Sequence, residues 1–168
     1  MPKIIENLDV KLMEEARRQI NEAGYGKVTI RSIAKVCGVG VGTVYNYFPS
    51  KDALLATYML ADWRSYMEAI EESAANHDSP QPVVRCIYGQ IKRFADIHQS
   101  IFRDEAAIAS FHNTSGQYHA MLRSQLAAPL GKFCTNDFAS EFIAEALLSW
   151  TMTDKTFEEL FEMVKKCF

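Results

Sequence analysis

Apolar residues recur at helical spacing along almost the whole chain. In the first segment they return about every four positions, from Leu8 to Ile20, and predict a helix over about residues 6–23. Gly24 follows as the expected left-handed C-cap of this helix. No stretch bounded by turn signals alternates cleanly between apolar and polar residues, as a half-buried β-strand would. The pattern therefore predicts an all-helical protein.

Residues 28–55 predict two short helices with a tight turn between them, followed by the start of a long helix. Thr29 is the expected N-cap of the first short helix, whose apolar residues have the spacing of a single helical face. Gly38 marks the turn. Pro49 ends the second short helix, because its ring cannot continue the hydrogen-bond ladder.

The second short helix carries small residues and aromatics instead of a complete apolar face. Val44 and Phe48, one turn apart, are its expected core contacts. Tyr45 and Tyr47 flank Asn46 and cannot both face inward on so short a helix. In a helix-turn-helix, one helix crosses the phosphate backbone and the next enters the major groove. The segment has this layout and predicts DNA binding.

The chain beyond residue 50 predicts further helices. Ser50 caps one that runs to about residue 75, and the loop at 76–82 is dense in residues that favour turns. The remaining helices are predicted at about 82–98, 100–112, 116–131, 137–152 and 155–167. This gives about nine helices in all.

Charge and cysteine usage agree with this interpretation. The 168 residues have a net charge of −3, but residues 1–50 carry +2 and residues 51–168 carry −5. A mildly basic segment on an acidic remainder is typical of a specific DNA reader. The four cysteines show no metal-site spacing, and no apolar run approaches the roughly 18–20 residues that span a bilayer. We expect a soluble, cytoplasmic protein with reduced thiols and no membrane partner.

The residues VTIRSIAKVCGV, followed by GTVYNYFPSKDALL, resemble the TetR family of bacterial transcriptional regulators over about residues 8–62. The ordered set of cap, turn, aromatic run, proline and Lys51 carries the resemblance. It implies an all-helical homodimer with a helix-turn-helix DNA-binding head at 1–50 and a helical effector-binding and dimerisation body at 51–168. We expect a repressor that binds a palindromic operator and is released or modulated by a small ligand.

The resemblance also implies which residues contact DNA. The base contacts would be Arg31, Val41, Gly42, Tyr45 and Asn46. The phosphate contacts would be Thr29, Thr43, Tyr47 and Lys51. Arginine can donate two hydrogen bonds to guanine and asparagine can bond adenine, although a solvated arginine at position 31 would look the same.

Two positions depart from the family, which commonly has Ser and then Lys or Arg where this chain has Gly40 and Val41. Glycine is a weaker N-cap than serine, and valine can touch a thymine methyl. We expect lower nonspecific affinity and an atypical operator.

Large side chains are frequent in the predicted body. In this family such residues often line an effector cavity, which here would suit an apolar or aromatic ligand, although ordinary core is the alternative for each. The candidates are Met59, Trp63, Tyr66, Met67, Tyr88, Phe94, Phe102, Phe111, Tyr118 and Met121. The spacing of His98, His112 and His119 does not place two metal ligands on one helical turn. We predict no metal, no cofactor and no catalytic residue.

The last two predicted helices carry apolar residues on more than one face. A helix that is apolar on two faces must be covered twice, once by its own body and once by another surface. We therefore predict a four-helix dimer interface built from these helices and their copies. Its residues would be Phe138, Phe142, Ala146, Trp150, Phe157 and Phe161.

Two other functions stay open at this point. The first is a DNA-binding activator or architectural protein without a small-molecule effector. The second is a helical ligand-binding or enzymatic domain whose helix-turn-helix pattern is accidental.

Overall fold

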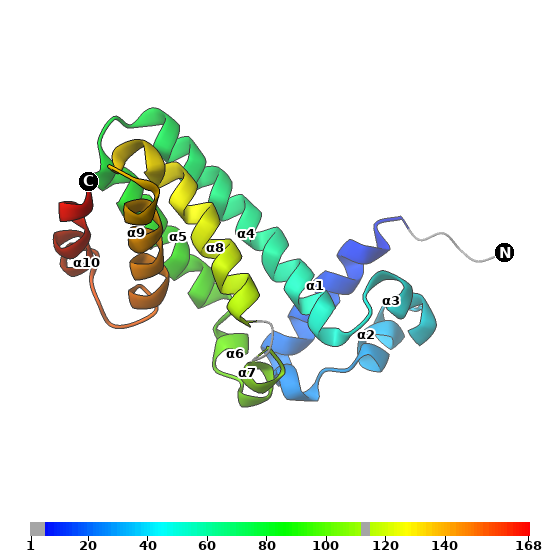
Figure 1. Cartoon of the computed structure of the whole chain (residues 1–168). Helices are drawn as coiled ribbons and strands as arrows, with labels where there is room; N and C mark the ends of the chain where they lie inside the picture. Colours follow the sequence, from blue (N-terminus) through cyan, green and yellow to red (C-terminus); the bar gives the residue numbers. More distant parts are fainter. Residues whose placement is uncertain (1–5, 112–114) are drawn as a thin grey trace. The chain divides into compact units, whose positions relative to one another are not determined.

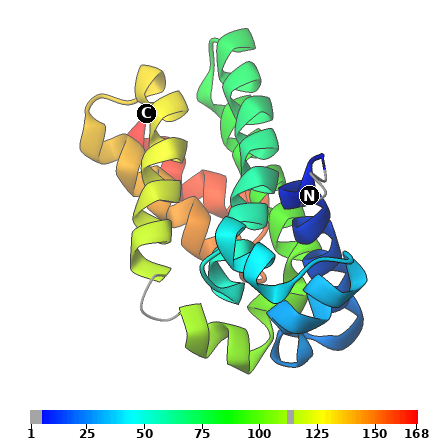
Figure 2. The same cartoon turned by 90° about the vertical axis from the view of Figure 1, so that its right-hand side faces the viewer.

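Helices make up all the regular structure in the computed structural model, which describes residues 6–111 and 115–168 (Figure 1 and Figure 2). The α-helices are α1 (Leu8–Ala23), α2 (Ile30–Val36), α3 (Val41–Tyr47), α4 (Lys51–Asn76), α5 (Pro80–Ile97), α6 (Gln99–Phe102), α7 (Glu105–Phe111), α8 (Ser115–Leu130), α9 (Asp137–Trp150) and α10 (Phe157–Val164). Single 3-10 turns lie at η1 (Tyr25–Lys27), η2 (Gly131–Phe133) and η3 (Lys165–Cys167). The predicted all-helical class is confirmed.

The capping residues explain where several helices begin. Thr29 caps α2, and the hydroxyl of Ser50 accepts a hydrogen bond from the amide of Ala53 (3.0 Å) at the start of α4. Thr156 and Glu159 form a reciprocal capping box at α10. These caps confirm the predicted starts, because capping depends on residues within one turn.

The single helix predicted at about 100–112 is wrong. The structure has two short helices there, α6 and α7, which are separated at Arg103 and Asp104. The carboxylate of Asp104 accepts hydrogen bonds from the amides of Ala106 (2.9 Å) and Ala107 (3.1 Å), so it starts a new helix. Residue 112, the predicted end, lies outside the described residues.

The chain packs as two compact units. The first contains Met1–Ala61 and His98–His112, and the second contains Asp62–Ile97 and Asn113–Phe168. The long helix α4 therefore begins in the first unit and continues in the second. The predicted division between residues 50 and 51 separates two functions and stays a prediction. In the structure, α6 and α7 also pack with the first unit.

The core of the first unit joins its helices through fully buried aliphatic side chains. The principal ones are Leu12, Ile20, Ile33, Val44, Leu54, Leu55, Ile101 and Ala107. Burying each of the larger ones contributes about 1.5–3 kcal/mol. Val44 and Phe48 both lie in this core, which confirms their predicted role.

In the second unit, α8 packs along α9, and both helices bury large aliphatic residues. Trp63 is also buried there, and its indole N–H donates to the side-chain oxygen of Gln125 (2.8 Å). Among the described residues, no helix combines the length and apolar character needed to cross a membrane.

Candidate nucleic-acid interface

The start of α2 is fixed by a capping box. The Thr29 hydroxyl accepts from the amide of Ser32 (3.0 Å), and the Ser32 hydroxyl accepts from the amide of Thr29 (3.1 Å). Ile30 and Ile33 on the same helix are buried in the core of the first unit. The side chain of Arg31 is therefore left on the exposed side of α2.

A tight turn joins α2 to α3. Gly38 has a φ of 68°, in the left-handed region where a residue with a side chain would be strained. Gly40 is the N-cap of α3 and, because it has no side chain, provides no side-chain hydrogen bond. The turn sets the direction in which α3 leaves α2, and glycine makes that direction possible.

The exposed side of α3 carries the aromatic pair. Tyr45 is 51% exposed and Tyr47 is 49% exposed, whereas Val44 is completely buried. Asn46, between the two tyrosines, is exposed as well. The prediction that the tyrosines do not both face inward is confirmed. The surface of α3 thus presents two phenols and an amide, groups that can reach base edges and phosphates.

The remaining predicted contacts on α3 differ in exposure. Gly42 is exposed and has open space around its Cα, so DNA could approach the backbone closely there. Val41 and Thr43 are half-buried, and Val41 packs against the core of the first unit. Part of the reason for an apolar residue at position 41 is therefore local packing.

Lys51 lies in an unexpected environment. Its ammonium donates hydrogen bonds to the carbonyl oxygens of Tyr25 and Val28, each at 3.0 Å, and lies 3.6 Å from the centre of the Tyr25 ring. Burial lowers the pKa of Lys51, while the carboxylates of Asp52 and Asp104 act in the opposite direction. In this structure the side chain holds the main chain that leads into α2. The phosphate contact predicted for Lys51 stays a prediction. To make it, the ammonium would have to leave these two carbonyl oxygens.

A buried phenol anchors the same turn. The Tyr25 hydroxyl donates to one carboxylate oxygen of Asp52, and the Ser110 hydroxyl donates to the other. Burial and the bond to Asp52 raise the pKa of Tyr25 to about 12. The cluster could not be predicted from the sequence, because its members come from three separate segments and share no local motif.

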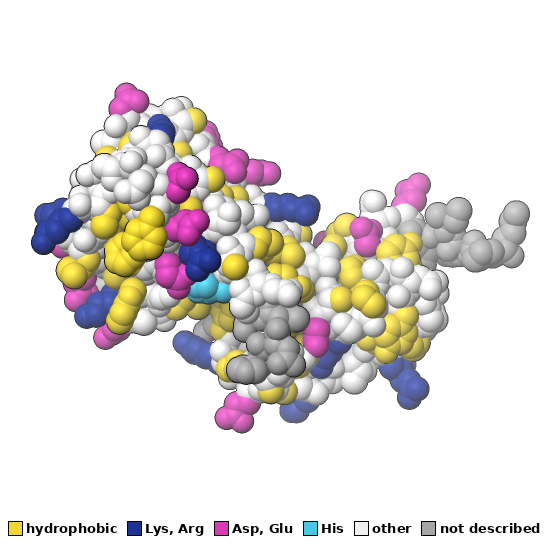
Figure 3. Space-filling model, viewed as in Figure 1, with side chains coloured by type: hydrophobic (Ala, Val, Ile, Leu, Met, Phe, Trp, Pro, Cys, Tyr) yellow, Lys and Arg dark blue, Asp and Glu magenta, His cyan; other side chains and the backbone are white. Residues whose placement is uncertain are grey.

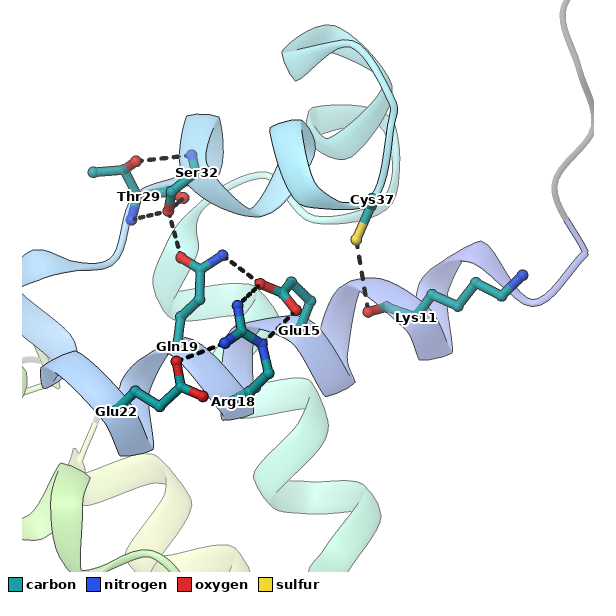
Figure 4. Close-up of polar contacts among 8 residues, drawn as sticks. All are labelled: Lys11, Glu15, Arg18, Gln19, Glu22, Thr29, Ser32 and Cys37. Carbon is teal, nitrogen blue, oxygen red and sulfur yellow. Dashed lines mark hydrogen bonds and ion pairs between the residues drawn. The ribbon is translucent and has the colours of Figure 1, made fainter.

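A polar network connects α1 to the start of α2 (Figure 4). Ser32 donates to the side-chain oxygen of Gln19 (2.6 Å), and Gln19 donates to Glu15 (2.6 Å). Arg18 in turn binds Glu15 and Glu22. Gln19 was likewise not among the residues predicted from the sequence. The i, i+4 spacing of Glu15 and Gln19 was the available signal, but it does not reveal the contact with Ser32.

The candidate pocket residues fall in both units. Met59, Phe102 and Phe111 belong to the first unit, and Phe102 is 37% exposed. In the second unit four are buried: Trp63, Tyr66, Met67 and Phe94. The Phe94 ring makes edge contacts with Trp63 (5.3 Å between centroids) and Tyr66 (5.9 Å). Ordinary core packing explains this cluster, and an effector cavity stays a prediction.

The other three candidates in the second unit are half-buried. The Tyr88 hydroxyl donates to the carbonyl of Lys155 (2.9 Å), and its ring packs edge-on against Phe157. Tyr118 and Met121 lie on α8. Within the described part of the chain, no three His, Cys, Asp or Glu side chains are grouped as a metal site requires, and His112 lies outside that part.

The predicted dimer residues differ sharply in exposure. Phe138 is 76% exposed, Phe142 51% and Trp150 53%, and apolar side chains gather over α9 in Figure 3. Ala146 and Phe161 are half-buried. Phe157 is only 4% exposed in its own chain, so its predicted contact with a partner stays a prediction that little exposed surface supports. The guanidinium of Arg85 lies 3.8 Å from the centre of the Phe157 ring, and the ring of Phe161 stacks on it with 5.4 Å between centroids.

The fold and this surface define a helix-turn-helix protein with a helical body. The profile of the bacterial regulatory proteins of the tetR family matches residues 12–58. Among curated relatives, the uncharacterized HTH-type transcriptional regulator YhgD of Bacillus subtilis (strain 168) is 30% identical over 106 residues, which are 59% of this chain and 53% of the relative. The HTH-type transcriptional repressor KstR of Rhodococcus jostii (strain RHA1) is 32% identical over 98 residues, or 52% and 44%.

Solved structures show the same fold along nearly the whole chain. The TetR family repressor AlkX from Dietzia sp. strain DQ12-45-1b superposes with a TM-score of 0.66 at 14% identity and covers 93% of each chain. A TetR-family regulator from Syntrophomonas wolfei gives a TM-score of 0.64 at 20% identity, covering 94% and 91%. Residues 12–58 thus match the tetR family of bacterial regulatory proteins, and the helices have the fold of solved TetR-family structures. The chain spans at most about half the length of the curated relatives it matches first.

Proposed function

We propose that this chain is a transcriptional repressor that binds a palindromic DNA operator as a homodimer and responds to a small apolar or aromatic ligand. The observation that carries the proposal is the two-sided character of α3. Its buried side is completed by Val44, and its exposed side presents Tyr45, Asn46 and Tyr47. A helix that displays rings and an amide to solvent on one side suits insertion into the major groove.

Base reading in this proposal depends on Arg31 from α2 and on the exposed side of α3. The arginine would donate to guanine, the asparagine at position 46 would bond adenine, and Val41 would touch a thymine methyl with its exposed part. Gly42 would allow close approach, and Tyr45 would pack against base edges or sugar. Thr29, Thr43 and Tyr47 would bind phosphates and orient the head. Lys51 would join them only if its ammonium left the carbonyls of the preceding turn.

Dimerisation in this proposal uses the exposed aromatic side of α9. Phe138, Phe142 and Trp150 are all at least half exposed, and large exposed rings on one helix are costly in water unless a partner covers them. A two-fold dimer would place two recognition helices about 34–36 Å apart, or somewhat further, to read two half-sites. The half-buried Ala146 and Phe161 would lie at the edge of the interface.

The effector response would use the continuity of α4. This helix starts at Lys51, beside the turn that leads into α2, and extends into the second unit, where Trp63, Tyr66 and Met67 are buried. A ligand that binds one arrangement of the units better than another shifts the population by its differential affinity. Release from DNA follows if the favoured arrangement spaces the two heads wrongly.

Fluorescence anisotropy against the DNA immediately upstream of the coding region tests the proposal. The titration is run at two salt concentrations, with a scrambled duplex of equal length as control. Tight, salt-sensitive binding to the native duplex alone is the expected result. Equal binding to both duplexes would favour an architectural role, and binding to neither at low salt would contradict DNA recognition at this site.

A matched pair of variants makes the test specific. Asn46→Ala removes an exposed amide on α3, whereas Gln99→Met alters an exposed side chain on α6, outside the predicted interface. Only the first variant should lose discrimination between the native and the scrambled duplex.

A further inference from the structure

The hydrogen bonds between α1 and α2 form a directed chain (Figure 4). The Ser32 hydroxyl donates to Gln19 Oε1, and Gln19 Nε2 donates to Glu15 Oε1, both at 2.6 Å. Arg18 binds the same carboxylate through its Nη2 (2.7 Å) and Nε (2.9 Å). In each link a hydroxyl or an N–H group donates and an oxygen accepts.

The carboxylate of Glu15 sets the orientation of the Gln19 amide. Arg18 lowers the pKa of Glu15 by hydrogen bonding, which keeps the group ionised, and an ionised carboxylate can only accept. The NH2 group of Gln19 must therefore face Glu15, and its carbonyl oxygen must face Ser32. The opposite orientation would place two oxygens in contact without a proton between them.

This orientation connects α1 to the first turn of α2. The Ser32 hydroxyl also lies 2.8 Å from the carbonyl oxygen of Thr29, a second acceptor for the same proton. Without Gln19 the proton would turn to Thr29, so the capping box would survive and the link to α1 would be lost. The buried Ile30 and Ile33 keep α2 on the core, but apolar contacts are non-directional and allow small rotations.

We propose that Gln19 is a positioning residue for DNA recognition: it binds no DNA itself but holds the start of α2, and with it Thr29 and Arg31, at a fixed rotation relative to α1. Arg31 directly precedes Ser32, so a rotation of the first turn of α2 moves the guanidinium relative to the bases. The inference rests on the proposed DNA-binding function.

Two variants of equal net charge test the role. Gln19→Met fills a similar volume and removes both hydrogen bonds. The double variant Glu15→Gln, Gln19→Glu exchanges the two groups, so an amide donates to a carboxylate that still accepts from Ser32. Packing alone would be satisfied by the methionine, whereas the hydrogen-bond chain is restored only by the exchange. Gln99→Met is the matched control, since Gln99 is exposed on α6.

The first readout is anisotropy on the duplex immediately upstream of the coding region. Gln19→Met should bind it about fivefold more weakly, the effect of losing one net hydrogen bond, and the exchanged pair should recover most of the affinity. Wild-type affinity in Gln19→Met, or equal weakness in both variants, overturns the proposal.

The second readout needs no DNA. NMR order parameters of the backbone amides from Thr29 to Ser32 should fall from the rigid value of about 0.85 in Gln19→Met and return in the exchanged pair. Unchanged order parameters overturn the positioning role even if DNA binding is found. Wild-type protein that binds no duplex overturns the proposed function instead, and the order parameters then still decide whether Gln19 holds α2.

Discussion

Replacement of Lys51 by methionine separates two roles that this side chain could have. In the structure its ammonium donates to the carbonyl oxygens of Tyr25 and Val28 and lies above the Tyr25 ring. In the predicted DNA complex the same ammonium contacts a phosphate. The first role stabilises the free protein, and the second acts only when DNA is bound.

The loss of stability can be worked out from these contacts. A hydrogen bond with a charged donor is worth about 1.5–3 kcal/mol, and a cation–π contact at a partly exposed site adds about 0.5–1 kcal/mol. The unfavourable burial of the ammonium, which lowers its pKa, offsets part of this. We expect Lys51→Met to lower the free energy of unfolding by about 2–3 kcal/mol, a decrease in Tm of roughly 5–10 °C for a chain of this size.

Thermal unfolding followed by circular dichroism measures the effect, with Lys27→Met as the matched control. Lys27 is an exposed lysine in the same turn, so its removal should change stability by less than about 0.5 kcal/mol. The salt dependence of DNA binding provides the second measurement, because each lost phosphate contact reduces the slope by about 1. A Lys51→Met protein with the wild-type Tm and a slope reduced by about 1 would refute the structural role of Lys51.

Three further predictions concern other parts of the chain. In anisotropy titrations, Asn46→Ala should weaken binding to the native duplex by roughly 5- to 100-fold and leave binding to the scrambled duplex unchanged. Equal losses of affinity for both duplexes would show that this residue does not read bases. Folding favours the neutral Tyr25 phenol, so the stabilisation it provides is complete below about pH 10 and lost as the pH rises through about 12. Ultraviolet absorbance after a pH jump should show a late ionisation that is lost in Tyr25→Phe, and an unchanged late ionisation in that variant would contradict the assignment to Tyr25. Phe142→Glu should give the mass of a monomer in light scattering at micromolar concentration, because a charge would be buried in the interface. Val36→Glu is the control and should stay dimeric, since Val36 on α2 is similarly exposed. A dimeric Phe142→Glu protein would place the interface elsewhere.

Local sequence signals are enough to predict the helices of the head and the two sides of α3. Thr29 and Ser50 cap helices through residues within one turn, and the i, i+4 spacing of Val44 and Phe48 leaves the tyrosines exposed. Such features depend on neighbours at most four positions away, so periodicity and capping residues are enough to predict them.

The groups that lie against the polar and aromatic side chains come from distant segments and follow from the three-dimensional packing alone. The carbonyl partners of Lys51 and the link from Gln19 to Ser32 join segments separated by 13 to 26 residues. Phe157 has the apolar spacing of an interface residue, yet Arg85 and Tyr88 from α5 cover it. A helical pattern indicates that a face must be covered, but it does not identify the covering group. Burial is non-directional, and the covering group comes from elsewhere in the chain.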